Sequence, residues 1–229
     1  MILPLLSPPE LLASGGMFYA FTVSTLAGKA VMFALFITSI VSWTVMYTKF
    51  QQVRAATRNG ADFLVALRAE EHFVEIFRKE KKWKDCPLYE LYVAGCQGIQ
   101  ASGGTADALK VRLLEGALER AVAEQVVRLE SQVSILGTAV GTAPFLGLLG
   151  TVWGVMDAFT GIALAGAATI GALAPGIAAA LITTVMGLVV ALPSMVGYNV
   201  LVAQIRRLTM EMENFASEFI DIARREIAG

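Results

Sequence analysis

The sequence predicts an all-α membrane protein with three transmembrane helices, the second and third of which extend into the cytoplasm as long helices. Of the 229 residues, 56% are hydrophobic and only 16% are charged, and the mean hydropathy is +0.64. An ordinary soluble domain has about 25% charged residues. Residues 131–205 contain a single charged side chain, that of Asp157. The sequence contains no alternating apolar and polar pattern of the kind that indicates a β-strand.

The first predicted span is residues 29–48, an apolar run between Lys29 and Lys49. A transmembrane helix needs about 20 residues to cross the hydrocarbon core of a bilayer. Trp43 and Tyr47 lie near the end of this run, where aromatic side chains favour the membrane interface. Length and flanking residues therefore both favour a membrane span.

The apolar stretch 131–205 is too long for one span and must fold back once. A glycine-rich segment between Gly161 and Gly176 is the expected turn, and Pro175 suits the first turn of the helix that follows. The predicted elements are a second span at 135–165, a turn at 166–175 and a third span at 176–203.

The distribution of Lys and Arg predicts the orientation. Residues 49–130 carry 13 of the 18 Lys and Arg residues and residues 206–225 carry four more, whereas the turn carries none. Cytoplasmic loops are enriched in these residues. The predicted arrangement is a periplasmic N-terminal segment at 1–28 and a periplasmic turn at 166–175, with a cytoplasmic helical domain at 49–134 and a cytoplasmic C-terminal helix at 204–229.

The segment before the second span has apolar residues at helical spacing and no Gly–Pro break. We therefore predict one unbroken helix over residues 105–165. Cys86 and Cys96 do not have the spacing of a zinc site and are expected to be ordinary thiols. The sequence shows no phosphate-binding loop and no nucleophile–base set, so we expect no enzyme, cofactor or metal. A net charge of −1 does not favour nucleic acid as a partner.

Small residues and prolines mark the second and third spans. Gly147, Gly150 and Gly154 follow one another at helical spacing, a pattern that lets helices approach closely in lipid. Pro144 and Pro193 each lie inside a predicted span, where a proline removes a backbone donor and can kink the helix. We expect these five residues to act in packing and kinking.

Hydroxyl side chains recur on both spans, and two interpretations stay open for them. A membrane threonine often bonds the carbonyl group four residues earlier in its own helix. Hydroxyls that face each other across two helices can both donate and accept, and so can line a proton or water path. The set comprises Thr138, Thr142, Thr151 and Thr160 on the second span and Thr183, Thr184 and Ser194 on the third.

Asp157 lies six residues after Thr151, or about 9 Å further along a helix. It is either a polar residue at the outer boundary of the membrane or a proton or water site that faces a lumen. Charged residues within spans usually face a bundle interior or a water-filled path.

Two segments, TAPFLGLLGTVWGVMDAF at 142–159 and APGIAAALITTVMGLVVALPSMVGYN at 174–199, closely resemble the span signatures of the TolQ/ExbB/MotA proton-channel family, in its TolQ/ExbB branch. The resemblance implies an inner-membrane homopentamer around a single-span dimer that resembles TolR or ExbD. It implies that protons cross the complex by way of an aspartate on the partner and that their flow delivers mechanical work to the periplasm or outer membrane. The positions that match path-lining residues are Thr151, Thr184 and Tyr198.

One position departs from the family pattern. Many TolQ and ExbB sequences have a glutamate where this chain has Ala179. Three explanations stay open: a natural subfamily, an engineered substitution, or relocation of the acidic function to Asp157. The absence of this glutamate also keeps a second function open, a pentameric scaffold that positions a single-span partner without conducting protons.

Overall fold

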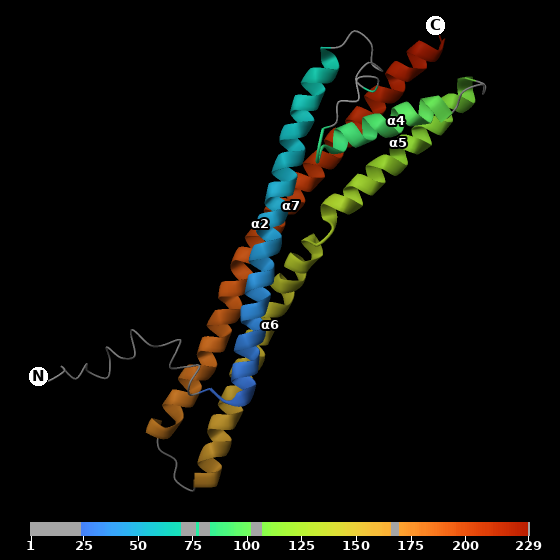
Figure 1. Cartoon of the computed structure of the whole chain (residues 1–229). Coiled ribbons are helices and arrows are strands. Elements are labelled where there is room, and N and C mark those ends of the chain that lie inside the picture. Colours follow the sequence, from blue (N-terminus) through green and yellow to red (C-terminus); the bar gives the residue numbers. More distant parts are fainter. Residues whose placement is uncertain (1–23, 70–76, 78–82, 102–106, 166–169, 229) are drawn as a thin grey trace, which may run out of the picture. The chain divides into compact units, whose positions relative to one another are not determined.

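Five α-helices make up the computed structural model, which describes residues 24–69, 77, 83–101, 107–165 and 170–228 (Figure 1). Within these ranges the model contains no strand, so the predicted all-α fold class is confirmed. The helices are α2 (Leu26–Arg68), α4 (Pro87–Ala101), α5 (Asp107–Glu130), α6 (Val133–Ala165) and α7 (Ile170–Ala228).

Three of these helices, α2, α6 and α7, are long and apolar enough to cross a membrane, as the sequence predicts. Their outward faces carry large apolar side chains such as Phe36, Phe145 and Val196, each more than half exposed. Lipid is the solvent that such faces require, because water would penalise this much apolar surface.

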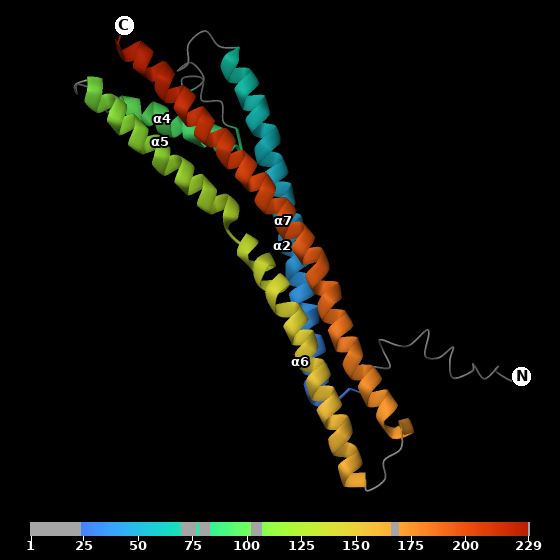
Figure 2. The same ribbon diagram turned by 180° about the vertical axis from the view of Figure 1, so that it is seen from behind.

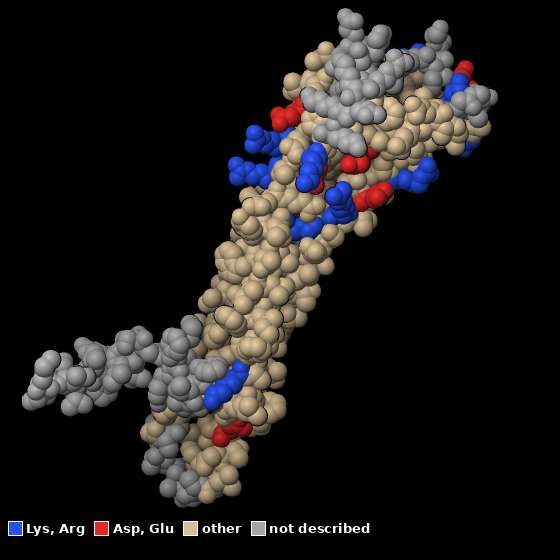
Figure 3. All heavy atoms as spheres, in the orientation of Figure 1, with Lys and Arg blue, Asp and Glu red and all other residues tan. Residues whose placement is uncertain are grey.

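The chain forms two compact units. The span unit comprises Met1–Val45 and Ile135–Tyr198, and the polar unit comprises Met46–Ser134 and Asn199–Gly229. On the face shown in Figure 3, charged residues gather over the helices of the polar unit and the span unit shows almost none. α2 and α7 each contribute to both units.

The core of the span unit joins all three of its helices. Leu35 on α2 is fully buried against Ala143 on α6 and against Val190 and Ala191 on α7. One large side chain thus fills the space left by small residues on the other two helices, which is how cores reach high packing density.

The prediction of one unbroken helix over residues 105–165 is wrong. α5 ends at Glu130 and α6 begins at Val133, while residues 105 and 106 lie outside the described residues. Gln132, in the break, has a φ of 67°. This left-handed conformation is common where helices end, although glycine usually supplies it. The sequence offers no glycine at this point and so gave no sign of the break.

Lys49 caps the end of α5. Its ammonium group is within hydrogen-bond distance of the carbonyl oxygens of Arg128 (3.2 Å) and Leu129 (3.3 Å), Gln52 Oε1 (3.0 Å) and Ser131 Oγ (3.1 Å). Lys49 is only 3% exposed. The last carbonyl groups of a helix have no partner within it, and a lysine is well suited to bond them. A residue that the sequence marks only as a flanking charge therefore stabilises the break.

Replacing Lys49 with methionine is expected to destabilise the protein by about 1–3 kcal/mol, because buried carbonyl groups lose their donor. The change keeps most of the side-chain volume. Thermal unfolding of the purified protein in detergent measures it, and faster amide exchange is expected around the break. Lys84→Met is the matched control, since Lys84 is exposed. An unfolding midpoint equal to that of the control would contradict the capping role.

α7 begins earlier than the sequence predicts. Residues 170–175 of the expected turn are helical, so Pro175 lies inside α7 and not in its first turn. Gly161 likewise lies within α6, which continues to Ala165. Residues 166–169 of the predicted turn lie outside the described residues. Proline removes one backbone donor from a helix, but near the start of a helix few bonds depend on it.

Aromatic side chains form the core of the polar unit. The ring centroid of Phe63 lies 5.3 Å from Trp83, 5.6 Å from Tyr92 and 6.1 Å from Phe215, each in an edge-to-face arrangement. These contacts tie α2 to α4 and to the part of α7 after Tyr198. Figure 2 shows the same helices from behind. Edge-to-face pairs add to the stabilisation from burial.

Both cysteines lie buried on α4 or just before it and both are free thiols. Burial raises the pKa of Cys86 and the pKa of Cys96 to about 11 each. They are therefore protonated at neutral pH, as the sequence analysis expects of ordinary thiols.

Gly95→Ala is expected to destabilise the polar unit by about 1–3 kcal/mol through overpacking. An added Cβ would lie 2.6 Å from Cζ of Phe219, and the Phe219 ring packs on Tyr92 and Phe215. Thermal unfolding followed by circular dichroism measures the effect.

Gly116→Ala on α5 is the matched control, because its new Cβ would meet only the flexible end of Arg120, at 3.3 Å. Alanine has the higher helix propensity, so this variant is expected to be unchanged or slightly more stable. Equal unfolding midpoints for the two variants would show that the ring does not constrain position 95.

Candidate functional site

Glycines bring α6 and α7 into close contact. A Cβ added to Gly147 would lie 2.8 Å from the carbonyl oxygen of Thr183. A Cβ added to Gly150 would lie 2.6 Å from Thr183 Oγ1. A Cβ added to Gly154 would lie 2.8 Å from the Cβ of Ala180. Cβ atoms essentially never come so near other atoms. Only glycine allows this separation of the two backbones, as small-residue packing in membranes requires.

The earlier glycine pair of α6 behaves differently. A Cβ on Gly137 would lie 3.3 Å from the ring of Tyr198, and a Cβ on Gly141 would have no atom within 4 Å. The close contact of α6 and α7 is therefore centred on Gly147, Gly150 and Gly154.

Three threonine hydroxyls meet beside this close contact of α6 and α7. The Thr151 hydroxyl on α6 makes a short hydrogen bond with that of Thr184 on α7 and lies 3.4 Å from that of Thr183. Thr183 is buried, and the other two residues are half-buried. We call Thr151, Thr183 and Thr184 the hydroxyl cluster.

Two backbone carbonyl groups converge on the hydroxyl cluster. Gly147 O is within reach of Thr183 Oγ1 (3.0 Å), Thr151 Oγ1 (3.2 Å) and Thr184 Oγ1 (3.3 Å). Ala180 O lies 2.7 Å from Thr183 Oγ1 and 3.1 Å from Thr151 Oγ1.

More acceptors than protons therefore surround the hydroxyl cluster. A threonine hydroxyl has one proton to donate and two lone pairs with which to accept. The protons of Thr151 and Thr183 can point to either carbonyl group, and that of Thr184 can point to Gly147 O or to Thr151, so several hydrogen-bond patterns fit the same heavy-atom positions. A chain of groups that can reorient in this way is what proton transfer between neighbouring oxygens needs.

Three of the other predicted hydroxyls bond within their own helices. Thr142 donates to Thr138 O (2.8 Å), Thr160 to Met156 O (2.9 Å) and Ser194 to Val190 O (2.8 Å). The structure thus divides the set that the sequence left open. Thr142, Thr160 and Ser194 bond a carbonyl group of their own helix. Thr151, Thr183 and Thr184 also meet across two helices.

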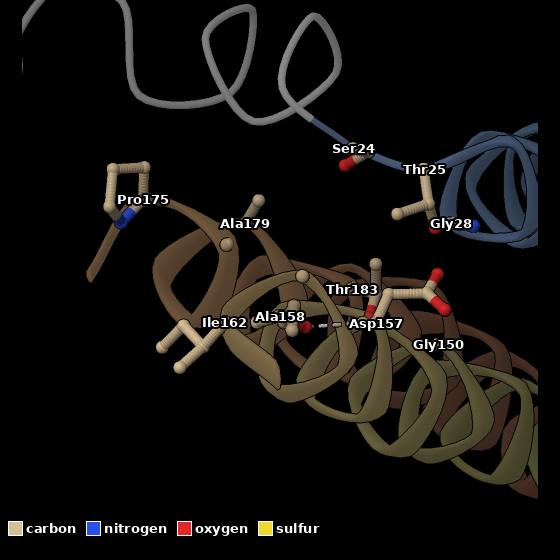
Figure 4. A pocket seen from close by; sticks show the side chains of 14 residues that line it. Ser24, Thr25, Gly28, Gly150, Asp157, Ala158, Ile162, Pro175, Ala179 and Thr183 are labelled. Carbon is tan, nitrogen blue, oxygen red and sulfur yellow. Dashed lines mark hydrogen bonds between the residues drawn. The ribbon is translucent and has the colours of Figure 1, made fainter. Parts of the chain in front are cut away.

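A cavity of about 400 Å³ adjoins the hydroxyl cluster and is lined by the start of α2, by α6 and by α7 (Figure 4). Thr183 of the cluster forms part of its wall, and so do Asp157 and Ala179. Asp157 is half-buried, and its carboxylate points toward the start of α2, near Thr25 and Gly28. One cavity therefore holds the single charged side chain of residues 131–205 and borders the hydroxyl cluster.

Tyr198, Pro144 and Pro193 lie away from this cavity. The Tyr198 ring faces Gly137 and lies 14 residues after Thr184 on α7, or about 21 Å along the helix. Both prolines lie inside helices that continue beyond them. In the described part of the chain, no three His, Cys, Asp or Glu side chains lie close enough to hold a metal ion.

Known proteins resemble this chain over the site. Residues 90–214 match the sequence model of a family described as the MotA/TolQ/ExbB proton channel family. The chain is 30% identical to the Tol-Pal system protein TolQ of Pseudomonas aeruginosa over 228 residues, covering 96% of this chain and 97% of that protein. It is 31% identical to the biopolymer transport protein ExbB of Pseudomonas putida over 201 residues, 87% of this chain and 60% of that protein. To ExbB of Salmonella typhimurium it is 28% identical, over 87% of this chain and 82% of that protein.

Proposed function

This chain belongs to the MotA/TolQ/ExbB proton channel family, in its TolQ/ExbB branch, and from that premise we propose that it conducts protons through the inner membrane to power mechanical work beyond it. Its three apolar helices and its relatives make it a multi-pass inner-membrane protein. The observation that carries the proposal is the hydroxyl cluster, three oxygens that join α6 to α7 within the apolar spans.

The proton path runs from the cavity into the hydroxyl cluster. Thr183 borders the cavity and lies within 3.4 Å of Thr151, which is bonded to Thr184. At each step an oxygen lone pair accepts an incoming proton while the same hydroxyl passes its own proton to the next oxygen, so no net charge accumulates on any one group. Asp157 lines the cavity end of this path, and Tyr198 lies 14 residues beyond Thr184 near the middle of α7.

The assembly that fits this role is a homopentamer around a single-span dimer that resembles TolR or ExbD. Large apolar side chains on the outward faces of the spans suit contact with lipid, with other copies and with a partner helix. The concentration of Lys and Arg in 49–130 and 206–225 supports a cytoplasmic position for these segments and a periplasmic N-terminus.

The partner supplies the rest of the relay. Residues 131–205 hold one carboxylate, and residues 30–48 of the first span hold none, so a titratable group on the partner helix completes the path. A threonine hydroxyl does not change its protonation state in water, whereas a carboxylate can bind and release a proton.

Reconstitution tests the shared relay. Liposomes that contain this chain together with the partner are expected to take up protons when a membrane potential is imposed, and liposomes with this chain alone are expected to take up far fewer. A pH-sensitive dye inside the vesicles reports the uptake. Equal flux from the chain alone would overturn the shared relay.

A non-conducting scaffold is the second candidate function. Ala179 favours the scaffold, because α7 lines the cavity at this position with a methyl group and not with a carboxylate. The same liposomes decide between the two candidates: if the assembled complex takes up no protons under an imposed potential, the chain is a scaffold.

A further inference from the structure

Asp157 occupies a place that packing between the spans does not explain. It projects from α6 into the cavity of about 400 Å³, a volume that would hold on the order of ten water molecules. Carboxylates within spans are costly to insert, and they usually face a bundle interior or water. A half-buried carboxylate at such a cavity can exchange protons with the water in it.

Small residues leave the room around Asp157. Gly154 and Gly150 on α6 and Gly28 on α2 line the same cavity as the carboxylate. Ser24 and Thr25, the two residues before α2, add hydroxyl groups to the wall. The cavity therefore has a polar side, near Asp157, and a second polar end at Thr183, where the hydroxyl cluster begins.

Ala179 lies across the cavity from the helix that carries Asp157. It is on α7, it is 3% exposed and its methyl group forms part of the wall. Asp157 lines the same cavity from α6. A carboxylate could therefore enter this cavity from either of two helices.

We propose that Asp157 is the proton-loading residue of this chain, and that its role depends on the cavity and not on the helix that carries the carboxylate. The carboxylate accepts a proton from a hydronium ion in the cavity, which leaves a neutral carboxylic acid and a water molecule. The acid then returns the proton through water to Thr183. This inference rests on the proposed proton-conducting function.

Moving the carboxylate from α6 to α7 tests the proposal in the complete complex with its partner, reconstituted in liposomes. Asp157→Asn keeps the shape and removes the proton-accepting group, so flux is expected to fall by about tenfold or more. Adding Ala179→Glu to Asp157→Asn is expected to restore most of the flux. Asp157→Asn with Ala179→Gln is the matched control, and it is expected to stay low.

Several outcomes would overturn the proposal. Full flux from Asp157→Asn would show that Asp157 loads no proton. Low flux from Asp157→Asn with Ala179→Glu, in a complex that size-exclusion chromatography shows to be assembled, would show that a carboxylate placed in the cavity is not sufficient for proton loading. As a second measurement, dicyclohexylcarbodiimide, which modifies protonated carboxyl groups in apolar surroundings, is expected to label Asp157 in the unmodified complex and to block flux. An absence of labelling by mass spectrometry would count against proton loading.

Two different results would distinguish a failure of this inference from a failure of the proposed function. If Thr151→Val stops the flux but Asp157→Asn does not, the proton-conducting function stands and Asp157 is not the loading residue. If the unmodified complex conducts no protons, the function itself fails before the question of loading arises.

Discussion

Thr151→Val is expected to lower proton flux through the assembled complex by about a hundredfold, the lower end of what a positioned proton-transfer group contributes. Thr151 is the residue that touches both other members of the hydroxyl cluster and both converging carbonyl groups. Valine has almost the same shape but no proton to donate and no lone pair. Dye-reported proton uptake into liposomes that contain the complex measures the effect.

Thr142→Val is the matched control for this prediction. The Thr142 hydroxyl lies on the same helix, is exposed and bonds Thr138 O, so its removal is expected to leave the flux unchanged. Equal flux from the two variants, with both complexes intact, would mean that the hydroxyl cluster is not on the proton path.

Gly147→Ala is expected to have the second large effect, a loss of α6–α7 packing that disrupts the hydroxyl cluster. The added Cβ would lie 2.8 Å from Thr183 O and 3.0 Å from Thr184 Cα. These are backbone atoms, so no side-chain rotation relieves the clash and the helices must separate. Overpacking of this kind costs about 1–3 kcal/mol or more. A lower unfolding temperature in detergent and reduced flux are the expected readouts.

Gly141→Ala provides the comparison, because its Cβ would meet no atom within 4 Å. It adds the same methyl group to the same helix and is expected to unfold at the temperature of the unmodified protein. If Gly147→Ala were as stable as Gly141→Ala and conducted normally, the close approach of the backbones would not be what holds the cluster together.

The sequence predicts the spans well because their signal is local. Long uncharged runs can only be buried or in lipid, and three of them become α2, α6 and α7. The break between α5 and α6 could not be predicted, because it depends on Lys49, about 80 residues away in the chain. Gln132, which takes the left-handed conformation there, is not a residue type that signals a helix end.

The site was only partly predictable for a similar reason. Seven hydroxyl residues share the pattern of small polar groups on apolar helices, and nothing in their spacing separates Thr142 from Thr151. The difference arises from how α6 and α7 are rotated against each other, which the contacts at Gly147 and Gly150 fix. That Asp157 and Ala179 line one cavity likewise depends on this packing.

The most direct test of the account is a double-mutant cycle for proton flux with Thr151→Val, Thr184→Val and the two combined. The two hydroxyls form one hydrogen-bonded relay, and groups that act as a unit are strongly non-additive. Each single variant is therefore expected to lose most of the flux, and the double variant is expected to lose little more. Flux that stays at the unmodified level in the double variant, with the complex assembled, would contradict the central claim that the hydroxyl cluster carries the protons.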